Sequence, residues 1–255
     1  MSINNKIETI ISTAINQGFK GIIHLVLRRV FLRDRITRRK LASKYLSGDG
    51  IEIGALHSPL KVPPKAKVRY VDRMSVADLR KQYPELSGCN LVEVDIIDNG
   101  EKLTSIEDCS LDFVIANHMI EHCQEPIGTM QQFLRVLKPG GVLYVAVPDK
   151  RYTFDFGRPV TSIEHLIRDY RDGSGWSKIK HFEEWCRLVQ KVPDAEISLS
   201  VNNLITMDYS IHFHVWTKEE FTELLKYCKD MLQFPFKTET VKGNYNEFIV
   251  ILRKI

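Results

Sequence analysis

The chain has 255 residues, of which 44% are hydrophobic and 27% are charged. This composition excludes a disordered or fibrous protein, and the length allows one large core with an appendage. The five cysteines lie far apart with no Cys-x-x-Cys pair, which argues against disulfides and a structural zinc site and favours a reducing cytoplasm. The longest apolar stretch, residues 21–27, is too short to span a bilayer, and the polar first 20 residues argue against a signal peptide.

The net charge of +4 is unevenly distributed. Residues 1–47 contain ten basic and two acidic residues, which gives +8, whereas the remainder contains 26 basic and 30 acidic residues, which gives −4. Because the body is mildly acidic, we predict no nucleic-acid partner.

Residues 1–47 are predicted to be a basic helical N-terminal extension. Apolar residues recur there at helical spacing, and Gly18 and Gly21 mark a break between two helices. A basic amphipathic helix can lie on an anionic membrane surface, so residues 20–44 are a candidate for peripheral membrane contact. The alternative is that its apolar face packs on the sheet or on a second copy of the chain.

Between residues 50 and 147 the pattern alternates between strands and helices, which predicts a parallel sheet with helices on both faces. Five apolar runs are predicted to be strands, at residues 51–54, 70–72, 92–96, 111–118 and 142–147. Helices are predicted at 75–83, with Ser75 as the N-cap, and at 126–137, with a proline in the first turn.

The alternation of predicted strands and helices stops over residues 149–216, which we interpret as an insertion with a broken helix or two. A capping box at Thr217 and Glu220 then begins a helix that runs to about Cys228. Two strands, about 232–241 and 247–252, follow and pair antiparallel through Gly243-Asn244. The fold class predicted for residues 48–255 is α/β, a Rossmann-like seven-stranded mostly parallel sheet with an antiparallel C-terminal strand pair.

Polar residues at the predicted strand ends indicate a ligand site, because ligands of open parallel sheets bind beyond the carboxyl ends of the strands. Gly54 is followed by Ala55-Leu56-His57-Ser58-Pro59, which lacks the glycines of a phosphate-binding loop. Asp72 is placed to accept hydrogen bonds from a ribose diol, and Asp95 could accept from an adenine amino group. A nucleoside without phosphates fits these features better than a dinucleotide does.

At this point the sequence resembles the class I S-adenosylmethionine-dependent methyltransferases, specifically the type-11 group. The resemblance covers roughly residues 48–150. It is carried by Glu52-Ile53-Gly54, by Asp72 and Asp95, by the loop 117–122, and most specifically by Phe133-Leu134-Arg135-Val136-Leu137-Lys138-Pro139-Gly140-Gly141. The chain departs from the family where Leu56 and Ser58 replace its second and third glycines. The variant Glu-Ile-Gly-Ala-Leu-His-Ser-Pro is similar to a subgroup often associated with bacterial polysaccharide gene clusters.

The resemblance implies S-adenosyl-L-methionine as the cofactor. The residues predicted to bind it are Glu52, Gly54, Ala55, Asp72, Arg73, Asp95, Ile96 and Asn117. The alternative for Asp72 and Asp95 is that they are only turn residues at strand ends.

The fourth predicted strand is not followed by the Asp/Asn-Pro-Pro-Tyr/Phe motif of many enzymes that methylate amines of bases. This favours oxygen or carbon acceptors, and a hydroxyl acceptor needs a base to take its proton. The candidate catalytic residues are His118, Asp149 and His214, since an imidazole titrates near neutral pH. The alternative for Asp149 is a solvated turn.

Aromatic and basic residues in the insertion suit a sugar or sugar-phosphate acceptor, or a lid over the site. The candidate substrate residues are Arg151, Tyr152, Arg158, His165, His181 and His212. If residues 212–216 are extended, His212, His214 and Trp216 share one face. A His-x-His pair can ligate a metal, but the sequence identifies no acidic or cysteine partner nearby, so no metal site is predicted. A substrate-facing wall and core histidines are the other interpretations.

The sequence therefore predicts a cytoplasmic S-adenosylmethionine-dependent O-methyltransferase that acts on a glycan or another polyhydroxylated small molecule. One alternative is a lipid-linked or aromatic acceptor at the inner face of the membrane. The other is a non-catalytic scaffold with a methyltransferase fold. The oligomeric state is not predicted.

Overall fold

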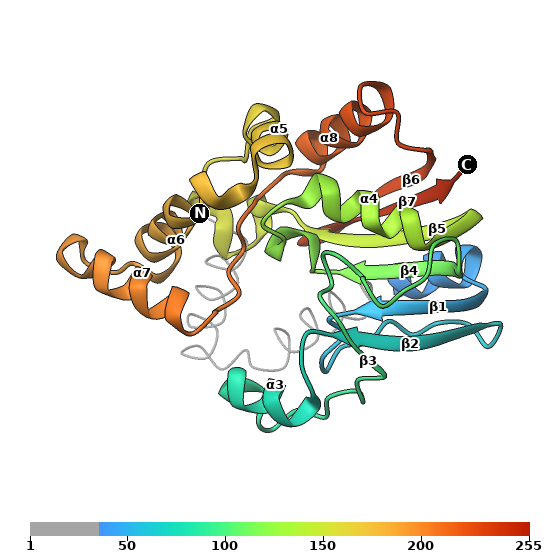
Figure 1. The fold of residues 1–255 in the computed structure, drawn as a ribbon, viewed down its shortest axis with the longest axis horizontal. Coiled ribbons are helices and arrows are strands. Elements are labelled where there is room, and N and C mark those ends of the chain that lie inside the picture. Colours follow the sequence, from blue (N-terminus) through green and yellow to red (C-terminus); the bar gives the residue numbers. More distant parts are fainter. Residues whose placement is uncertain (1–35) are drawn as a thin grey trace, which may run out of the picture.

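The structure of the protein, a computed structural model, describes residues 36–255. The prediction of helices before residue 36 falls outside the described residues. A seven-stranded sheet runs through the fold in the order β3-β2-β1-β4-β5-β7-β6 (Figure 1). Its strands are β1 (Gly48–Ile53), β2 (Ala66–Asp72), β3 (Ile96–Ile97), β4 (Leu111–Asn117), β5 (Leu137–Pro148), β6 (Phe236–Asn244) and β7 (Glu247–Lys254). Strands β1 to β5 are parallel to one another, and β7 is antiparallel to both β5 and β6. The predicted fold class is confirmed.

The central strands are buried on both faces, which explains why they read as continuous apolar runs. In β5, Leu143 and Val145 belong to one core cluster, and Tyr144 and Ala146 belong to the other. The first cluster is covered by α4 (Pro126–Val136) and α8 (Lys218–Asp230), which lie on the same face of the sheet (Figure 1). The capping box of Thr217 and Glu220 begins α8 as predicted.

The opposite face is covered by the helical residues 36–45 and the turn after them. Ala42 and Leu46 are fully buried there, and Leu41 and Tyr45 pack beside them. In this described part of the basic extension, the apolar side therefore packs on the sheet. No helix within residues 36–255 is long and apolar enough to cross a bilayer.

Two strand boundaries differ from the prediction. The third strand is Ile96–Ile97 rather than 92–96, because the alternating burial of 92–95 belongs to an irregular segment that leads into the sheet. In the C-terminal pair, β6 continues through Gly243 and Asn244, and the turn lies at Tyr245 and Asn246. Tyr245 adopts a left-handed conformation with φ of 59° there, which its side-chain type did not indicate.

The insertion contains three helices, α5 (Ile163–Asp172), α6 (Lys178–Trp185) and α7 (Ile197–Thr206), besides short 3₁₀ and π turns. The sequence predicted only a broken helix or two. Its own small core includes Phe182, Trp185 and Phe213. Figure 1 shows α6 and α7 beyond the carboxyl ends of β1, β2 and β4, on the same side as the short α3 (Val76–Gln82). The insertion therefore covers the edge of the sheet where a ligand is expected.

Candidate active site

A cleft of about 720 Å³ lies at the carboxyl ends of the parallel strands. This volume falls within the range of about 300–1,000 Å³ that ligand pockets occupy. Residues that follow β1, β2, β3 and β4 line one side, among them Gly54, Asp72, Gly100 and His118. The insertion lines the other side with Lys178, Phe182, Ile205, Asp208, Tyr209, Ser210 and Phe213. A second cavity of about 320 Å³ shares Gly54, Leu56 and His118 with the cleft.

The loop after β1 supplies an open backbone surface in both cavities. Gly54 has φ of 64°, and a Cβ added to it would meet no atom within 4 Å. Leu56 is also left-handed, with φ of 48°, a conformation that costs a non-glycine residue about 1–2 kcal/mol. The glycine therefore leaves room for a ligand beside the backbone, at the point where the family resemblance begins.

The second strand ends in a carboxylate that faces the cleft. Asp72 Oδ1 accepts a hydrogen bond from the Arg73 backbone N at 2.7 Å, and burial raises the pKa of Asp72. The Arg73 guanidinium contacts Asp208 Oδ2 at 2.6 Å and the Tyr83 hydroxyl at 3.1 Å. Arg73 therefore links the loop after β2 to the residues after α7. The sequence pointed to Arg73 but not to Asp208, because their separation of 135 residues leaves no local signal.

The smaller cavity contains a buried acid and an unpaired amide oxygen. Glu52 is 1% exposed and accepts hydrogen bonds from Leu60 N at 3.0 Å, and burial raises its pKa to about 7. Asn117 Nδ2 donates to Glu52 Oε1 at 3.3 Å. Asn117 Oδ1 is buried and has no hydrogen-bond partner among the described residues. Because a buried oxygen without a partner is costly, a ligand donor is the natural complement to it. Ala55 lines this cavity too.

Asp95 does not lie where the sequence placed it. Because β3 begins at Ile96, Asp95 precedes the strand, and its Oδ2 accepts a hydrogen bond from Tyr70 N at 2.7 Å. It lines neither cavity, and neither does Ile96. The carboxyl end of β3 instead brings Asn99, Gly100 and Glu101 to the cleft. A Cβ on Gly100 would lie 2.7 Å from Ile53 Cγ2, so only glycine lets this loop approach β1.

His118 follows β4 and lines both cavities. It is left-handed, with φ of 50°, and its Nε2 lies 2.6 Å from Glu247 Oε2. Glu247 also contacts the Arg38 guanidinium, with Arg38 Nε 2.8 Å from Oε1. Despite burial, the Arg38 and His118 partners hold the pKa of Glu247 at about 2. Burial lowers the pKa of His118, but Glu247 and the nearby Glu121 together outweigh it, and the net pKa is raised.

His122 also lines the cleft, one turn beyond His118. Its Nδ1 lies 2.9 Å from the Ile211 carbonyl and 3.0 Å from Ser210 Oγ. Since a carbonyl only accepts, Nδ1 carries the proton. Burial lowers the pKa of His122 to about 3, so the ring is neutral at neutral pH. Beside it, Glu121 is 1% exposed with no hydrogen-bond partner on either oxygen within residues 36–255, and burial raises its pKa.

The other candidate residues lie outside the lining of both cavities. Asp149 caps a 3₁₀ turn and pairs with Arg151 through two contacts, at 2.9 and 2.7 Å. The Arg151 guanidinium lies over the Tyr152 ring. Arg158 is 3% exposed and bonds to Asp155 at 2.8 Å, besides Glu184 and the Phe213 carbonyl.

The two histidines of the 212–216 segment have different neighbours. His212 Nδ1 lies 2.7 Å from Asp155 Oδ2. His214 is fully buried in a cluster with His165, Asp169 and His181, and its ring stacks on that of Trp216 with centroids 5.8 Å apart. Within the described residues, this segment pairs with the rest of the fold through one bridge between Asp149 and Trp216. The catalytic and substrate assignments made from the sequence stay predictions.

The strand order and the ligand edge define the class I S-adenosylmethionine-dependent methyltransferase fold. A family model described as a methyltransferase domain matches residues 47–227. Since the match covers well over half of the chain, the chain belongs to this family. The chain therefore contains a methyltransferase domain of this family, whose cofactor is S-adenosyl-L-methionine.

Individual relatives are more distant. A probable S-adenosylmethionine-dependent methyltransferase from Mycolicibacterium smegmatis is 34% identical over 87 residues, which cover 34% of this chain and 30% of that relative. The chain thus matches less than a third of that relative's length. A chain in the complex between the Haloferax volcanii Trm112 methyltransferase activator and the putative methyltransferase is 11% identical, with 97% of each chain covered and a TM-score of 0.50. A SAM dependent methyltransferase from Aquifex aeolicus is 16% identical, with 89% and 93% covered and a TM-score of 0.48. At 11% identity, the similarity to the Haloferax volcanii complex concerns the fold alone.

Proposed function

We propose that this methyltransferase transfers the methyl group to a hydroxyl of a glycan or another polyhydroxylated small molecule, with His118 as the general base. The observation that carries the proposal is the pairing of His118 with Glu247 at the wall of the cleft, 2.6 Å apart. A carboxylate on one ring nitrogen orients the imidazole and raises the basicity of the other, as in other histidine-carboxylate pairs.

The cofactor, when bound, supplies an electrophilic methyl group on a sulfonium. The residues present fit it: Gly54 leaves open space, Asn117 offers an unpaired oxygen and Asp72 offers a carboxylate at the cleft. In this proposal Asp72 accepts hydrogen bonds from the ribose hydroxyls, and Gly54 and Asn117 hold the methionine part. The loop at Gly100 packs beside the adenine, in place of the role that the sequence gave to Asp95 and Ile96.

The acceptor hydroxyl loses its proton as its oxygen takes the methyl group; the methyl carbon–sulfur bond would break in exchange and leave S-adenosylhomocysteine. Neutral His118 donates its Nε2–H to Glu247, which leaves the Nδ1 lone pair to take that proton. Arg38 keeps Glu247 ionised, so that the carboxylate stabilises the imidazolium which results. His122 is neutral at neutral pH, but a pKa of about 3 makes it a weak base, and we assign it a hydrogen-bonding role toward the acceptor.

The wall formed by the insertion supports a polyhydroxylated acceptor. Tyr209 offers an aromatic ring, while Lys178, Asp208 and Ser210 offer charges and hydrogen-bonding groups on the same side of the cleft. Sugars are bound by such combinations of stacking and polar contacts. The similarity of the first loop to a polysaccharide-cluster subgroup points to the same class of acceptor.

The decisive experiment combines a binding assay with a pH profile. Titration calorimetry with S-adenosylhomocysteine first separates an enzyme from a non-catalytic scaffold, because a scaffold with a degenerate first loop binds none. Turnover is then measured at saturating cofactor on a panel of sugars and nucleotide sugars. We expect His118→Ala to lower kcat by about 10²–10⁴-fold, the usual contribution of a general base, with unchanged S-adenosylhomocysteine affinity.

The pH profile distinguishes a base from a merely structural histidine. Because His118 must be neutral and its pKa is raised, kcat should rise with pH through that raised value. Glu247→Gln removes the partner that raises it, so the midpoint should move to lower pH. An unchanged midpoint in Glu247→Gln, or wild-type turnover in His118→Ala, contradicts the assignment.

A lipid-linked or aromatic acceptor at the membrane stays the alternative. The basic residues that motivate it lie mostly before residue 36, and residues 41–46 pack on the sheet. Cosedimentation with anionic liposomes, comparing the full chain with a variant that lacks residues 1–35, tests this contact. We also propose a domain boundary after residue 47. Residues 1–47 then form the extension, and residues 48–255 form the methyltransferase domain with an insertion at 149–216.

A further inference from the structure

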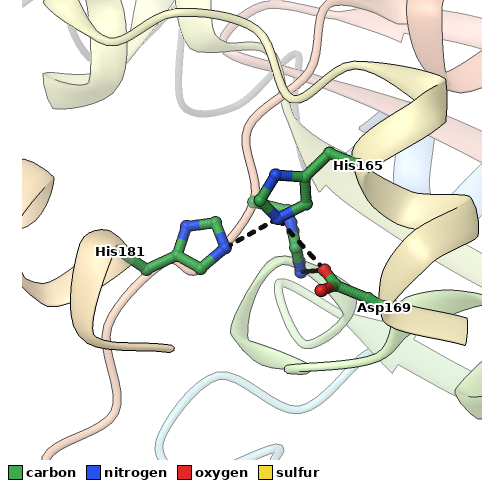
Figure 2. Close-up of side chains that lie close together, drawn as sticks. His165, Asp169 and His181 are labelled. Atoms are coloured by element: carbon green, nitrogen blue, oxygen red, sulfur yellow. Dashed lines mark hydrogen bonds and ion pairs between the residues drawn. The ribbon is translucent and has the colours of Figure 1, made fainter. Parts of the chain in front are cut away.

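Four side chains from three segments of the insertion converge at one point. His165 and Asp169 come from successive turns of α5, His181 from α6, and His214 from the irregular segment that precedes α8. His165 Nε2 lies 3.0 Å from His181 Nε2 and 3.1 Å from Asp169 Oδ2, and His214 Nε2 lies 3.7 Å from the same oxygen. Figure 2 shows the His165 and His181 rings and the Asp169 carboxylate turned toward one another.

The cluster is buried, and its hydrogen bonds are incomplete. Asp169 and His214 are 0% exposed and His181 is 8% exposed. Ser177 Oγ donates to Asp169 Oδ1 at 2.9 Å, which fixes the carboxylate and leaves Oδ2 facing the imidazoles. Among residues 36–255, Asp169 Oδ2 and His214 Nδ1 have no hydrogen-bond partner. A buried carboxylate oxygen in this state is costly unless a cation neutralises it.

Hydrogen bonding among the four side chains cannot satisfy every atom. A neutral imidazole has one N–H donor, so of the two Nε2 atoms 3.0 Å apart, His165 and His181, only one can donate to the other. A neutral imidazole ligates a metal through the lone pair of its unprotonated nitrogen.

We propose that His165, Asp169, His181 and His214 form a four-coordinate structural site for a divalent transition metal, with Zn²⁺ as the preferred ion. Ligand atoms about 2.0 Å from a tetrahedral centre lie about 3.3 Å apart. The separations of 3.0, 3.1 and 3.7 Å bracket this distance, and all four ligand atoms lie within 4.8 Å of one another. Three nitrogens and one oxygen are borderline ligands that suit Zn²⁺ and leave no open position.

The site forms its outer contacts from the same chain. Ser177 orients the carboxylate, as outer-sphere partners of metal ligands do. For His214 to ligate through Nε2, its proton must reside on Nδ1, and its 3.3 Å contact with the Gln124 carbonyl is then not a hydrogen bond. The side chain of His165 is 24% exposed, which provides the path for the ion to enter.

The metal would hold the insertion together beside the cleft. The residues that follow His181 and precede His214 are Phe182 and Phe213, and both line the cleft. None of the four ligands lines it. The ion therefore positions one wall of the acceptor site without contacting the acceptor, and its presence is independent of the methyl-transfer chemistry.

The test measures metal binding by the full chain. The protein is dialysed against a chelator and titrated with Zn²⁺ by calorimetry, and the metal content of untreated protein is measured by mass spectrometry. We expect one Zn²⁺ per chain and a rise of Tm on metal addition. Asp169→Asn keeps the shape of the side chain but should weaken Zn²⁺ affinity by more than about 100-fold, beyond the loss of an outer-shell partner. Arg171→Gln, on the exposed face of α5, is the matched control and should bind as wild type.

Two further measurements keep the result interpretable. X-ray absorption of the zinc-loaded protein should show nitrogen and oxygen ligands at about 2.0 Å with no sulfur. S-adenosylhomocysteine titration reports folding of the cofactor site in every variant, so a variant that merely unfolds is recognised. Absence of co-purified metal together with no Zn²⁺ binding at micromolar concentration overturns the proposal, and so does equal affinity in Asp169→Asn and wild type; the cluster is then a hydrogen-bonded histidine network.

Discussion

The charge cluster of Glu247, Arg38 and His118 predicts a pH-dependent loss of stability when its acid is removed. Glu247 is 2% exposed and contacts both cationic partners. Replacing it by Gln keeps the volume and removes the negative charge, and with it the ion pair with Arg38 and the charge-assisted hydrogen bond with His118. We expect Glu247→Gln to destabilise the protein strongly at neutral pH, because breaking a buried ion pair costs about 3–5 kcal/mol.

The pKa of Glu247 gives a second, independent value for the free energy by which this side chain stabilises the fold. Its fall from the ordinary 4.5 to about 2 in the folded protein, at about 1.4 kcal/mol per pH unit, corresponds to about 3 kcal/mol of stabilisation. Because the folded-state pKa lies below the unfolded value, this stabilisation is complete above about pH 4.5 and is lost as the pH falls toward about 2. The cost of breaking the ion pair and the stabilisation derived from the pKa of Glu247 therefore agree to order of magnitude.

Urea unfolding of wild type and Glu247→Gln at a series of pH values is the assay. The free-energy gap should be about 3 kcal/mol at about pH 7 and should shrink to about 2 kcal/mol at about pH 3.5. Glu107→Gln, at an exposed position, serves as the control and should change stability by less than about 0.5 kcal/mol at every pH. A gap that stays constant across this range would refute the electrostatic reasoning and indicate a loss of packing instead.

Three further predictions concern the cofactor site and the core. Asp72→Asn should raise the dissociation constant of S-adenosylhomocysteine by about 10–100-fold, since a hydrogen bond to a charged group contributes about 1.5–3 kcal/mol; unchanged calorimetric affinity would remove Asp72 from the site. Gly54→Val places a branched side chain in the open space at a φ of 64°, so binding should be lost in the same titration while far-UV circular dichroism is retained; wild-type affinity would show that the ligand lies elsewhere. Phe133→Ala empties a fully buried position under α4 and should cost about 3–5 kcal/mol in urea unfolding, against less than about 0.5 kcal/mol for the exposed Met231→Ala; equal effects would contradict the placement of the core.

The strands and helices that the sequence located well are those whose signal is local. The runs that became β4 and β5 are apolar because both faces of these strands are buried. The sequence marks the start of α4 with a proline in its first turn and the start of α8 with a capping box. The third strand was misplaced because only two of its residues pair with β2, too few to produce a pattern. That shift moved Asp95 away from the ligand edge and brought Gly100 to it.

In the candidate site, too, the sequence located the residues with a local signal but not the partners that lie far away along the chain. Gly54, Asp72 and His118 follow strands directly, so the rule that ligands bind beyond parallel strand ends places them at the cleft. The side chains that contact His118 and Arg73, the residue after Asp72, come from far along the chain. Asp208 contacts Arg73, and Glu247 contacts His118. Such pairs leave no trace in the local sequence, because their residues approach one another only when the strands and the insertion pack.

The sequence by itself determined the fold class, which depends on hydrophobic periodicity, and its resemblance to the class I methyltransferases implied the cofactor. Residues adjacent to strand ends indicated the edge of the sheet where a ligand is expected. Only the tertiary structure decided the environment of each histidine. His118 lies beside a carboxylate on β7, whereas His214, which the sequence left without an acidic partner, meets Asp169 from α5. The physical reason is that the pKa and ligand chemistry of an imidazole depend on its neighbours in space, and these are fixed by how α5, α6 and the segment before α8 pack together.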